Sequence, residues 1–238
     1  MAIGMNPEVM KRCLVAVPLL TALSPADLDM LVSSARPVSF KKGARIFEEG
    51  SPADCCFVLT SGRARVVLAG SGDTEILLNI LTPPALIGEI GLLDHSTRSA
   101  SLVAAEPCHL IRMNGAAFQS LRANRAFEDR LVAELVSTVR RSDDRVRVIS
   151  SFPTVKRVAW CLGRVASVSG RREGGDIVIP KTSHQELAEM AGCTRETVSR
   201  AMQMLRKKKY VAVDSRTMRI DIAAMQRYLT TELTVPGR

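Results

Sequence analysis

The alternation of hydrophobic and polar residues divides the chain into three parts. Between Val38 and Met113, short apolar runs are separated by glycine-containing breaks, a pattern typical of β-strands. From about Arg125 to Ser150, apolar residues recur at spacings of three and four, which indicates one long helix. After Pro153 the pattern changes to short amphipathic helices and short strands. The sequence therefore predicts an α+β fold with a β-rich N-terminal part.

Four apolar runs in the first part are predicted to form a compact antiparallel barrel or jelly roll. These runs are Phe57–Leu59, Ala64–Leu68, Glu75–Ile80 and Cys108–Arg112. Ahead of them, Ser24 and Asp27 have the spacing of a capping box and Pro25 suits a first helical position, so we expect a helix there. A barrel of this size can enclose a ligand.

Two short helices joined by a tight turn are predicted in residues 182–200. Ser183 and Glu186 have the spacing of a capping box, and Thr194 can cap the second helix. Gly192 lies between them, where the chain must reverse. This is the pattern of a helix-turn-helix, for which the alternative is a solvated pair of surface helices.

The second of these helices carries side chains suited to reading DNA. Arg195, Glu196 and Arg200 are expected to point outward, while Leu187, Val198 and Leu205 face the interior. Arginine can donate two hydrogen bonds to guanine and glutamate can accept one from cytosine, so this helix is predicted to enter a major groove. We expect DNA contacts from Ser183, His184, Thr194, Arg195, Glu196, Thr197, Ser199, Arg200 and Lys208.

The segments around the helix pair complete a winged helix. Val211–Val213, a polar turn and Met218–Ile222 have the pattern of a hairpin, which would be the wing. Asp176–Ile179 is predicted as a further strand, and a first helix is expected from about Thr154 to Val168.

Most of the excess positive charge lies in this C-terminal part. Residues 153–238 contain 16 Lys and Arg against 8 Asp and Glu, a net +8, whereas residues 1–152 contain 17 against 16, a net +1. Together these give the +9 of the whole chain. The basic run Arg206–Lys209 closes the second helix, within reach of phosphates. This distribution favours nucleic acid as a partner.

The remaining composition favours a cytoplasmic binding protein. Six cysteines are irregularly spaced without a CxxC pair, which indicates reduced thiols, and adjacent Cys55 and Cys56 would face opposite sides of a strand. The three histidines are scattered, so no metal site is expected. The apolar run around Pro18 is interrupted and no segment has the roughly 18 apolar residues of a membrane span. No nucleophile, base or phosphate-binding loop is arranged as in an enzyme, so no catalytic residues and no covalent cofactor are predicted.

The long helix carries a seam of apolar residues at alternating spacings of three and four. The seam residues are Val132, Leu135, Val139, Ser142, Val146 and Ile149. Such a seam is typical of a two-stranded coiled coil and predicts a parallel homodimer. The alternative is a helix that packs only on its own barrel.

The segment from Leu86 to Ala100 resembles the phosphate-binding cassette of cyclic-nucleotide-binding domains, through Gly88-Glu89 and Arg98-Ser99. The order of barrel, long helix and winged helix resembles the CRP/FNR family of transcription regulators over almost the whole chain. The resemblance implies that Glu89 bonds the ribose 2′-hydroxyl and that Arg98 and Ser99 bind the cyclic phosphate. It implies a ligand site of Gly88, Glu89, Ile90, Arg98 and Ser99, with Ser142 and Asp143 near the base. The alternative is an ion pair between Glu89 and Arg98 in a pocket without ligand.

Three departures from the family pattern leave the effector open. Pro83-Pro84-Ala85 replaces a frequent Gly-Asp turn, and the loop from Glu89 to Arg98 is one residue shorter than in the cyclic AMP-dependent members. Asp143 brings a charge to the base end, which could accept from a guanine edge. Cyclic AMP is the effector expected first, with cyclic GMP and cyclic di-GMP as alternatives.

The domain organisation follows from these parts. A cyclic-nucleotide-binding-like sensor domain is predicted at residues 1–123, a dimerisation helix and hinge at 124–152, and a winged-helix DNA-binding domain at 153–238. Two recognition helices of a dimer would meet major grooves about one turn, roughly 34 Å, apart, so the expected target is palindromic DNA. The resemblance implies TGTGA-like half-sites and RNA polymerase as a further partner. The alternatives are a regulator that acts without ligand and a nucleotide-binding module without DNA function.

Overall fold

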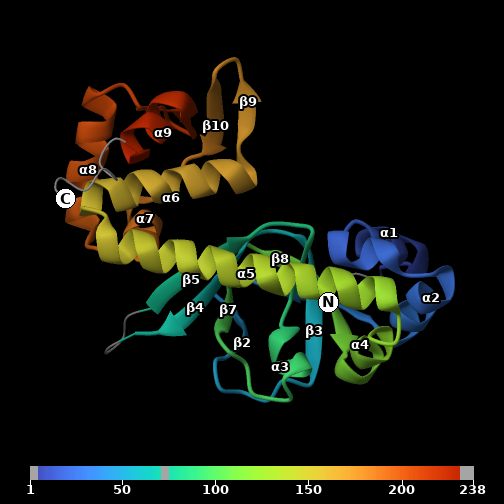
Figure 1. The fold of residues 1–238 in the computed structure, drawn as a ribbon. Coiled ribbons are helices and arrows are strands. Elements are labelled where there is room, and N and C mark those ends of the chain that lie inside the picture. Colours follow the sequence, from blue (N-terminus) through green and yellow to red (C-terminus); the bar gives the residue numbers. More distant parts are fainter. Residues whose placement is uncertain (1–4, 71–74, 231–238) are drawn as a thin grey trace. The chain divides into compact units, whose positions relative to one another are not determined.

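The computed structural model describes residues 5–70 and 75–230 and confirms the predicted α+β fold (Figure 1). The chain forms two compact units, Met1–Arg140 and Arg141–Arg238, which divide within the long helix α5 (Arg125–Ser151). The predicted domain limits at residues 123 and 152 lie close to the two ends of this helix, and they stay a prediction.

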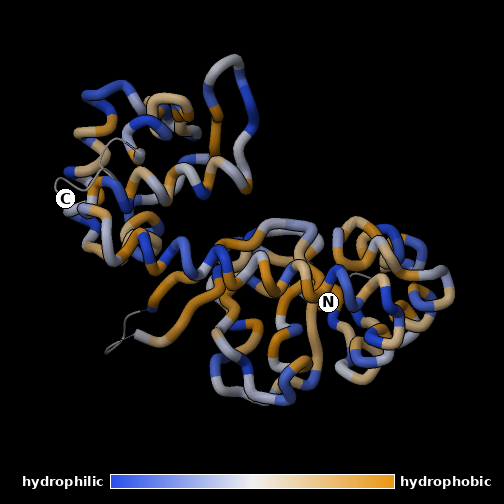
Figure 2. Tube along the Cα trace, viewed as in Figure 1, coloured by the Kyte–Doolittle hydropathy of each residue, from blue (hydrophilic) through white to orange (hydrophobic). Residues whose placement is uncertain are grey.

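The first unit contains a β-roll of two four-stranded antiparallel sheets. One sheet has the strand order β1-β8-β3-β6 and the other has the order β2-β7-β4-β5. The strands are β1 (Arg36–Phe40), β2 (Arg45–Phe47), β3 (Cys55–Ser61), β4 (Ala64–Ala69), β5 (Glu75–Leu81), β6 (Ala85–Ile87), β7 (Ser101–Ala104) and β8 (Cys108–Asn114). The four predicted strands occur as β3, β4, β5 and β8; each is longer than predicted at its C-terminal end, and β3 is also longer at its start. Figure 2 shows β4 and β5 as mostly hydrophobic.

Strand β3 is buried on both faces. Cys55 and Phe57 belong to a hydrophobic cluster formed by strands of both sheets. Cys56 and Val58 belong to a second cluster, which also contains the helices of this unit. Because successive side chains of a strand point to opposite faces, the predicted opposite orientation of Cys55 and Cys56 is confirmed.

The second hydrophobic cluster is formed by the helices of this unit, by the start of α5 and by the sheet that contains β3. The helices are α1 (Pro7–Val15), the 3-10 helix η1 (Pro18–Ala22), α2 (Pro25–Ser34) and α4 (Gly115–Leu121), and a short α3 (Ile90–Leu93) follows β6. The capping box of α2 is confirmed, since Asp27 N–H donates to Ser24 Oγ and Ser24 N–H to Asp27 Oδ2, both at 3.1 Å. Phe118 of α4 and Phe127 of α5 meet edge to face with ring centroids 5.8 Å apart, which anchors the start of α5.

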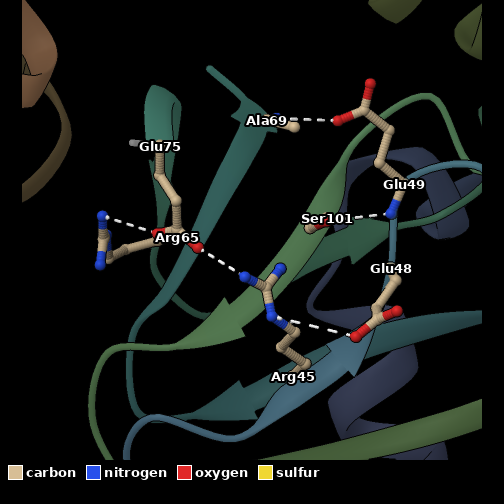
Figure 3. Close-up of polar contacts among 7 residues, drawn as sticks. All are labelled: Arg45, Glu48, Glu49, Arg65, Ala69, Glu75 and Ser101. Atoms are coloured by element: carbon tan, nitrogen blue, oxygen red, sulfur yellow. Dashed lines mark hydrogen bonds and ion pairs between the residues drawn. The ribbon is translucent and has the colours of Figure 1, made fainter. Parts of the chain in front are cut away.

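Polar contacts join the strands of the second sheet at its surface (Figure 3). Glu75 of β5 accepts from Arg45 of β2 at 2.8 Å and from Arg65 of β4 at 3.4 Å. The Glu49 carboxylate accepts from the backbone N–H of Ala69 at 2.9 Å. Because these side chains are partly exposed, each ion pair contributes at most about 1 kcal/mol. The contacts therefore link β2 and β4 to β5 across the sheet but add little stability.

The second unit is a winged helix. It contains α6 (Thr154–Ser169), β9 (Arg171–Glu173), β10 (Asp176–Pro180), α7 (His184–Ala191), α8 (Arg195–Lys207), β11 (Val211–Val213), β12 (Thr217–Asp221) and α9 (Ile222–Thr230). The strands form one antiparallel sheet of order β11-β12-β10-β9. Leu187, Val198 and Leu205, which the sequence placed in the interior, are fully buried.

The end of the wing differs from the prediction. The sequence pattern placed Ile222 in the second wing strand, and this was wrong, because β12 ends at Asp221 and Ile222 begins α9. The Asp221 carboxylate accepts from the backbone N–H of Ala224 at 2.8 Å, as a helix-capping side chain does. Alternating apolar residues continue past the strand, so periodicity alone did not mark this boundary.

Candidate functional site

Arg98 lies in the cassette segment between α3 and β7, and only 3% of its surface is exposed. Its Nη1 donates to the carbonyl of Gly88 at 2.7 Å, and its Nη2 donates to the carbonyl of Cys55 at 2.7 Å. The Cys55 Sγ lies 3.4 Å from Nη2. Arg98 Nε is also buried and has no hydrogen-bond partner among the described residues. Since a buried charge needs hydrogen-bond partners, a guanidinium with an unused donor is suited to an anion.

An aromatic ring completes the surroundings of this guanidinium. The guanidinium carbon of Arg98 lies over the Phe47 ring, 4.4 Å from its centroid, which is within the range of cation–π attraction. Phe47 in turn stacks on Phe57, with ring centroids 6.0 Å apart and planes inclined by 22°. The sequence analysis missed Phe47, because β2 is only three residues long and carries no recognisable motif.

Gly88 is required at its position for two reasons. Its φ of +85° lies in the left-handed region, which favours glycine. A Cβ atom at Gly88 would lie 2.6 Å from Nη1 of Arg98 and 3.5 Å from the Phe47 ring. The missing side chain therefore makes room for the guanidinium.

Glu89 precedes α3 and is half-buried. Burial raises the pKa of its carboxyl group; Glu134 of α5 also raises it, while its own backbone N–H and Arg98 lower it. Both Glu89 and Arg98 are described, and no ion pair joins them. The alternative of a direct Glu89–Arg98 pair is therefore absent from this structure, and the carboxylate is left for another donor.

The other predicted cassette residues lie at the surface. Ile90 begins α3 and is 38% exposed, and Ser99 is exposed beside Arg98. A groove of about 740 Å³ adjoins the cassette, with Asp54 and Thr97 among its lining residues. Neither Glu89 nor Arg98 lines this groove, but other residues of the cassette segment do: Gly91, Leu92, His95, Ser96 and Thr97.

Helix α5 exposes a row of apolar side chains. The exposed large apolar residues are Val132, Val136, Val139, Val146 and Ile149. Of the predicted seam, Leu135 instead packs partly against the core of the first unit. Ser142 and Asp143 are exposed on the part of α5 that belongs to the second unit, and their role at the base stays a prediction.

The helix-turn-helix has the caps that its sequence predicts. Glu186 N–H donates to Ser183 Oγ at 3.1 Å, and Ser183 N–H donates to the Glu186 carboxylate at 2.9 Å, which confirms the capping box of α7. Gly192 ends this helix with a φ of +60°, in the left-handed region. Thr197 N–H donates to Thr194 Oγ1 at 3.3 Å at the start of α8.

Helix α8 presents polar side chains outside its buried face. Arg195, Glu196 and Arg200 are exposed, whereas Val198 is fully buried. The pKa of Glu196 is lowered, first by its own backbone N–H and then by Thr194 and the two arginines, so its carboxylate stays charged and can accept from a base.

The other predicted DNA contacts divide into two kinds of position. His184 and Ser199 lie together, since His184 Nδ1 and Ser199 Oγ are 2.9 Å apart. Lys208, at the end of α8, is exposed and its ammonium group lies over two tyrosine rings. The structure therefore brings His184 to the recognition helix and gives Lys208 an aromatic environment that the sequence did not indicate.

Other chemistry is limited in the described part of the chain. Among residues 5–70 and 75–230, no group of three or more His, Cys, Asp or Glu could hold a metal ion. None of the described helices has the length and apolar character to cross a membrane. The cysteines are free thiols. Burial raises the pKa of Cys161 to about 12, which keeps this thiol protonated and unreactive.

Two family models match the chain in the order of its two units. Residues 37–125 match the cyclic nucleotide-binding domain, and residues 156–228 match the Crp-like helix-turn-helix domain. Fold and site together define a DNA-binding transcription regulator with a cyclic nucleotide-binding domain.

Similar proteins extend over both units. The cyclic AMP receptor protein of Thermus thermophilus is 30% identical over 209 residues, which cover 87% of this chain and 94% of that protein. The CRP-like cAMP-activated global transcriptional regulator of Mycobacterium tuberculosis is 25% identical over 213 residues, or 89% and 95% of the two chains. The chain belongs to the CRP family of transcription regulators. The structure of the c-di-GMP responsive global regulator CLP of Xanthomonas campestris shares the fold, with a TM-score of 0.67, 18% identity and coverage of 83% and 99%.

Proposed function

We propose that this regulator is a homodimer whose affinity for specific DNA sites is controlled by a cyclic nucleotide bound in the β-roll. The observation that carries the proposal is the buried guanidinium of Arg98, fixed by two carbonyls and a ring, with its Nε unpaired among the described residues. In this proposal Arg98 and Ser99 bind the cyclic phosphate, and Glu89 accepts from the ribose 2′-hydroxyl. A preorganised charged donor is the strongest contact available to a phosphate.

Cyclic AMP is the first effector to test, because the two similar regulators are named for it. Cyclic GMP is the second, since a carboxylate such as Asp143 could accept from guanine. Cyclic di-GMP is the third, because a regulator with the same fold is named as responsive to it. Ser142 and Asp143 are proposed to contact the base.

The exposed valines of α5 support the homodimer. Val139 and Val146 leave 61% and 64% of their surfaces in water, and a parallel coiled coil would bury this row against its copy. Dimerisation would give two copies of α8 for a palindrome whose half-sites are about one helical turn apart. Arg195, Glu196 and Arg200 are proposed to read a TGTGA-like half-site, while Lys208 is proposed to contact a phosphate.

The cellular setting belongs to the same proposal. A regulator of this family would act in the cytoplasm, and we propose RNA polymerase as its further partner. No enzymatic activity is proposed, because the site offers binding groups and no activated nucleophile.

A second candidate is a regulator that binds DNA without any nucleotide. The observation that favours it is that Gly88, Cys55 and Phe47 already stabilise the charge of Arg98, so the pocket does not need an anion to fold. A nucleotide-binding module without DNA function is disfavoured by the helix-turn-helix match.

The test is an anisotropy titration of a fluorescent palindrome with two TGTGA-like half-sites at one fixed salt concentration. The protein is titrated without ligand and with cyclic AMP, cyclic GMP or cyclic di-GMP, beside the variants Arg98→Ala and Glu89→Ala. We expect one nucleotide to change the affinity of the native protein for this DNA. The same nucleotide should leave the DNA affinity of both variants unchanged. Tight binding that no nucleotide changes would support the ligand-independent regulator instead.

A further inference from the structure

Two tyrosines and two lysines meet at the C-terminal end of the recognition helix α8. The ring of Tyr228, in α9, and the ring of Tyr210, just after α8, have centroids 5.5 Å apart. The ammonium group of Lys208 lies over both rings, 5.2 Å from the Tyr228 centroid and 5.9 Å from the Tyr210 centroid. Both distances are within the range of cation–π attraction.

The backbone of Lys208 is fixed, so the rings decide where its ammonium group lies. Lys208 caps α8, with its N–H donating to the carbonyl of Met204 at 3.0 Å. The next residue, Lys209, turns the chain with a φ of +60°, and Tyr210 N–H donates to the carbonyl of Leu205 at 3.0 Å. An exposed lysine otherwise samples many rotamers, and holding it in one costs side-chain conformational entropy. The two rings compensate for part of that cost before DNA arrives.

The Tyr228 ring is itself held from a third element. Lys156 of α6 is only 4% exposed, and its ammonium group lies 5.5 Å from the Tyr228 centroid and 5.8 Å from that of Phe152. Tyr228 therefore joins the first helix of the winged helix, the C-terminal helix and the end of the recognition helix. Its position is determined by the core of the unit rather than by solvent.

We infer that Tyr228 is a positioning residue for DNA binding, which holds the ammonium group of Lys208 in place for a DNA phosphate. The inference rests on the proposed phosphate contact of Lys208. It assigns a role to α9, a helix that the sequence analysis did not predict. Because a phosphate contact is independent of base sequence, this role can be tested without knowing the target site or the effector.

The experiment measures binding of the full chain to a random-sequence duplex across a series of salt concentrations, without nucleotide. The variants are Lys208→Ala, Tyr228→Leu, their double variant, and Tyr228→Phe as the conservative control that keeps the ring. Lys208→Ala should reduce the slope of log affinity against log salt by about 0.9. Tyr228→Leu should weaken binding about fivefold, Tyr228→Phe less than about twofold, and the double variant should match Lys208→Ala alone.

Each of the other outcomes contradicts either the phosphate contact of Lys208 or the positioning role of Tyr228. An unchanged salt slope for Lys208→Ala means that Lys208 does not contact a phosphate, so the proposed function of this residue fails. The positioning role of Tyr228 is overturned if Lys208→Ala binds DNA more weakly while Tyr228→Leu binds it as tightly as the native protein. It is also overturned if the losses of affinity of the two single variants add in full in the double variant. A lower melting temperature of Tyr228→Leu without loss of DNA affinity also overturns it. If Tyr228→Leu does not fold, Tyr210→Leu, which removes the other ring from Lys208, replaces it with the same expected non-additivity.

Discussion

The guanidinium of Arg98 lies over the Phe47 ring at 4.4 Å, so the side chain that we assign to the nucleotide phosphate is held by an aromatic face. The carbonyls of Gly88 and Cys55 hold its edge at the same time. These contacts fix the orientation of the guanidinium, so less entropy has to be lost when it binds a phosphate. The affinity for the nucleotide should thus depend on Gly88, Cys55 and Phe47, which contact Arg98.

Replacing Phe47 should weaken nucleotide binding. Phe47→Leu keeps an apolar side chain and removes the ring face, which costs about 1–2 kcal/mol for a desolvated cation–π pair, or roughly 5- to 30-fold in Kd. Isothermal titration calorimetry with the effector that changes DNA binding measures this loss. Phe47→Tyr, which keeps a ring, is the control and should bind within about threefold of the native protein. Equal affinity of Phe47→Leu and the native protein would contradict the role of the ring.

Replacing Gly88 should cost more than backbone strain alone. In Gly88→Ala the new Cβ would lie 2.6 Å from Arg98 Nη1, so the guanidinium must move. Gly43→Ala is the matched control, because Gly43 has a φ of +83° and a Cβ added there would meet no atom within 4 Å. Both variants should lose about 1–2 kcal/mol of stability to the left-handed backbone, but only Gly88→Ala should weaken nucleotide binding, by at least about tenfold. Chemical denaturation and calorimetry separate the two effects.

The stability of the protein should depend on the charge of Glu89. Because burial raises the pKa of this carboxyl above its ordinary 4.5, the folded chain binds its proton more tightly than the unfolded chain. The charged carboxylate therefore costs stability above both pKa values, and the cost disappears as the pH falls through the folded pKa. Glu89→Gln should melt at a higher temperature than the native protein at pH 7.5, with a difference that shrinks towards pH 4.5. Differential scanning fluorimetry across this pH range tests this, and a difference that stays the same down to pH 4.5 would contradict the assigned cost.

A charge on the exposed row of α5 should separate the proposed dimer. Val139→Asp places a carboxylate where each copy would bury a valine, which should raise the dimer dissociation constant at least about a hundredfold. Val168→Asp is the control, because Val168 is 52% exposed on α6, outside the row. Sedimentation velocity reads out both. A monomeric native protein would refute the dimer, whatever the variants do.

Removing Arg200 should reduce specificity as well as affinity. The loss of a bidentate contact to guanine costs about 1–3 kcal/mol, or roughly 5- to 150-fold, on the preferred palindrome. Affinity for a duplex with that G·C pair changed should fall much less. Competition anisotropy with both duplexes measures the ratio, and equal losses on both would assign Arg200 to the DNA backbone instead.

Much of the fold could be predicted because local signals are strong. The caps at Ser24, Ser183 and Thr194 involve residues three positions apart, and all three form as expected. The long helix and the wing strand Val211–Val213 follow from periodicity in the same way. The cassette residues were found through family resemblance, and the structure shows Arg98 buried beside Gly88.

The surroundings of that arginine could not be predicted, because they come from contacts distant in sequence. Phe47 and Cys55 are 51 and 43 residues from Arg98 along the chain, and neither belongs to a motif. The same holds for Lys208, which a linear pattern identifies as basic but cannot place over Tyr228. Helix α9 was missed because a single side chain, Asp221, decides where strand gives way to helix.

The short range of these caps also has a consequence for folding kinetics. The turns that define α7 and α8 are closed by bonds between residues three to five positions apart, including Cys193 N–H to the carbonyl of Ala188 at 3.1 Å. Contacts so close in sequence need little loop closure, and elements with low contact order form quickly. The β-roll instead pairs β1 with β8 and β2 with β7, strands that are far apart along the first unit. After complete unfolding, the helix pair that reads DNA should regain its structure before the pocket that is proposed to control it.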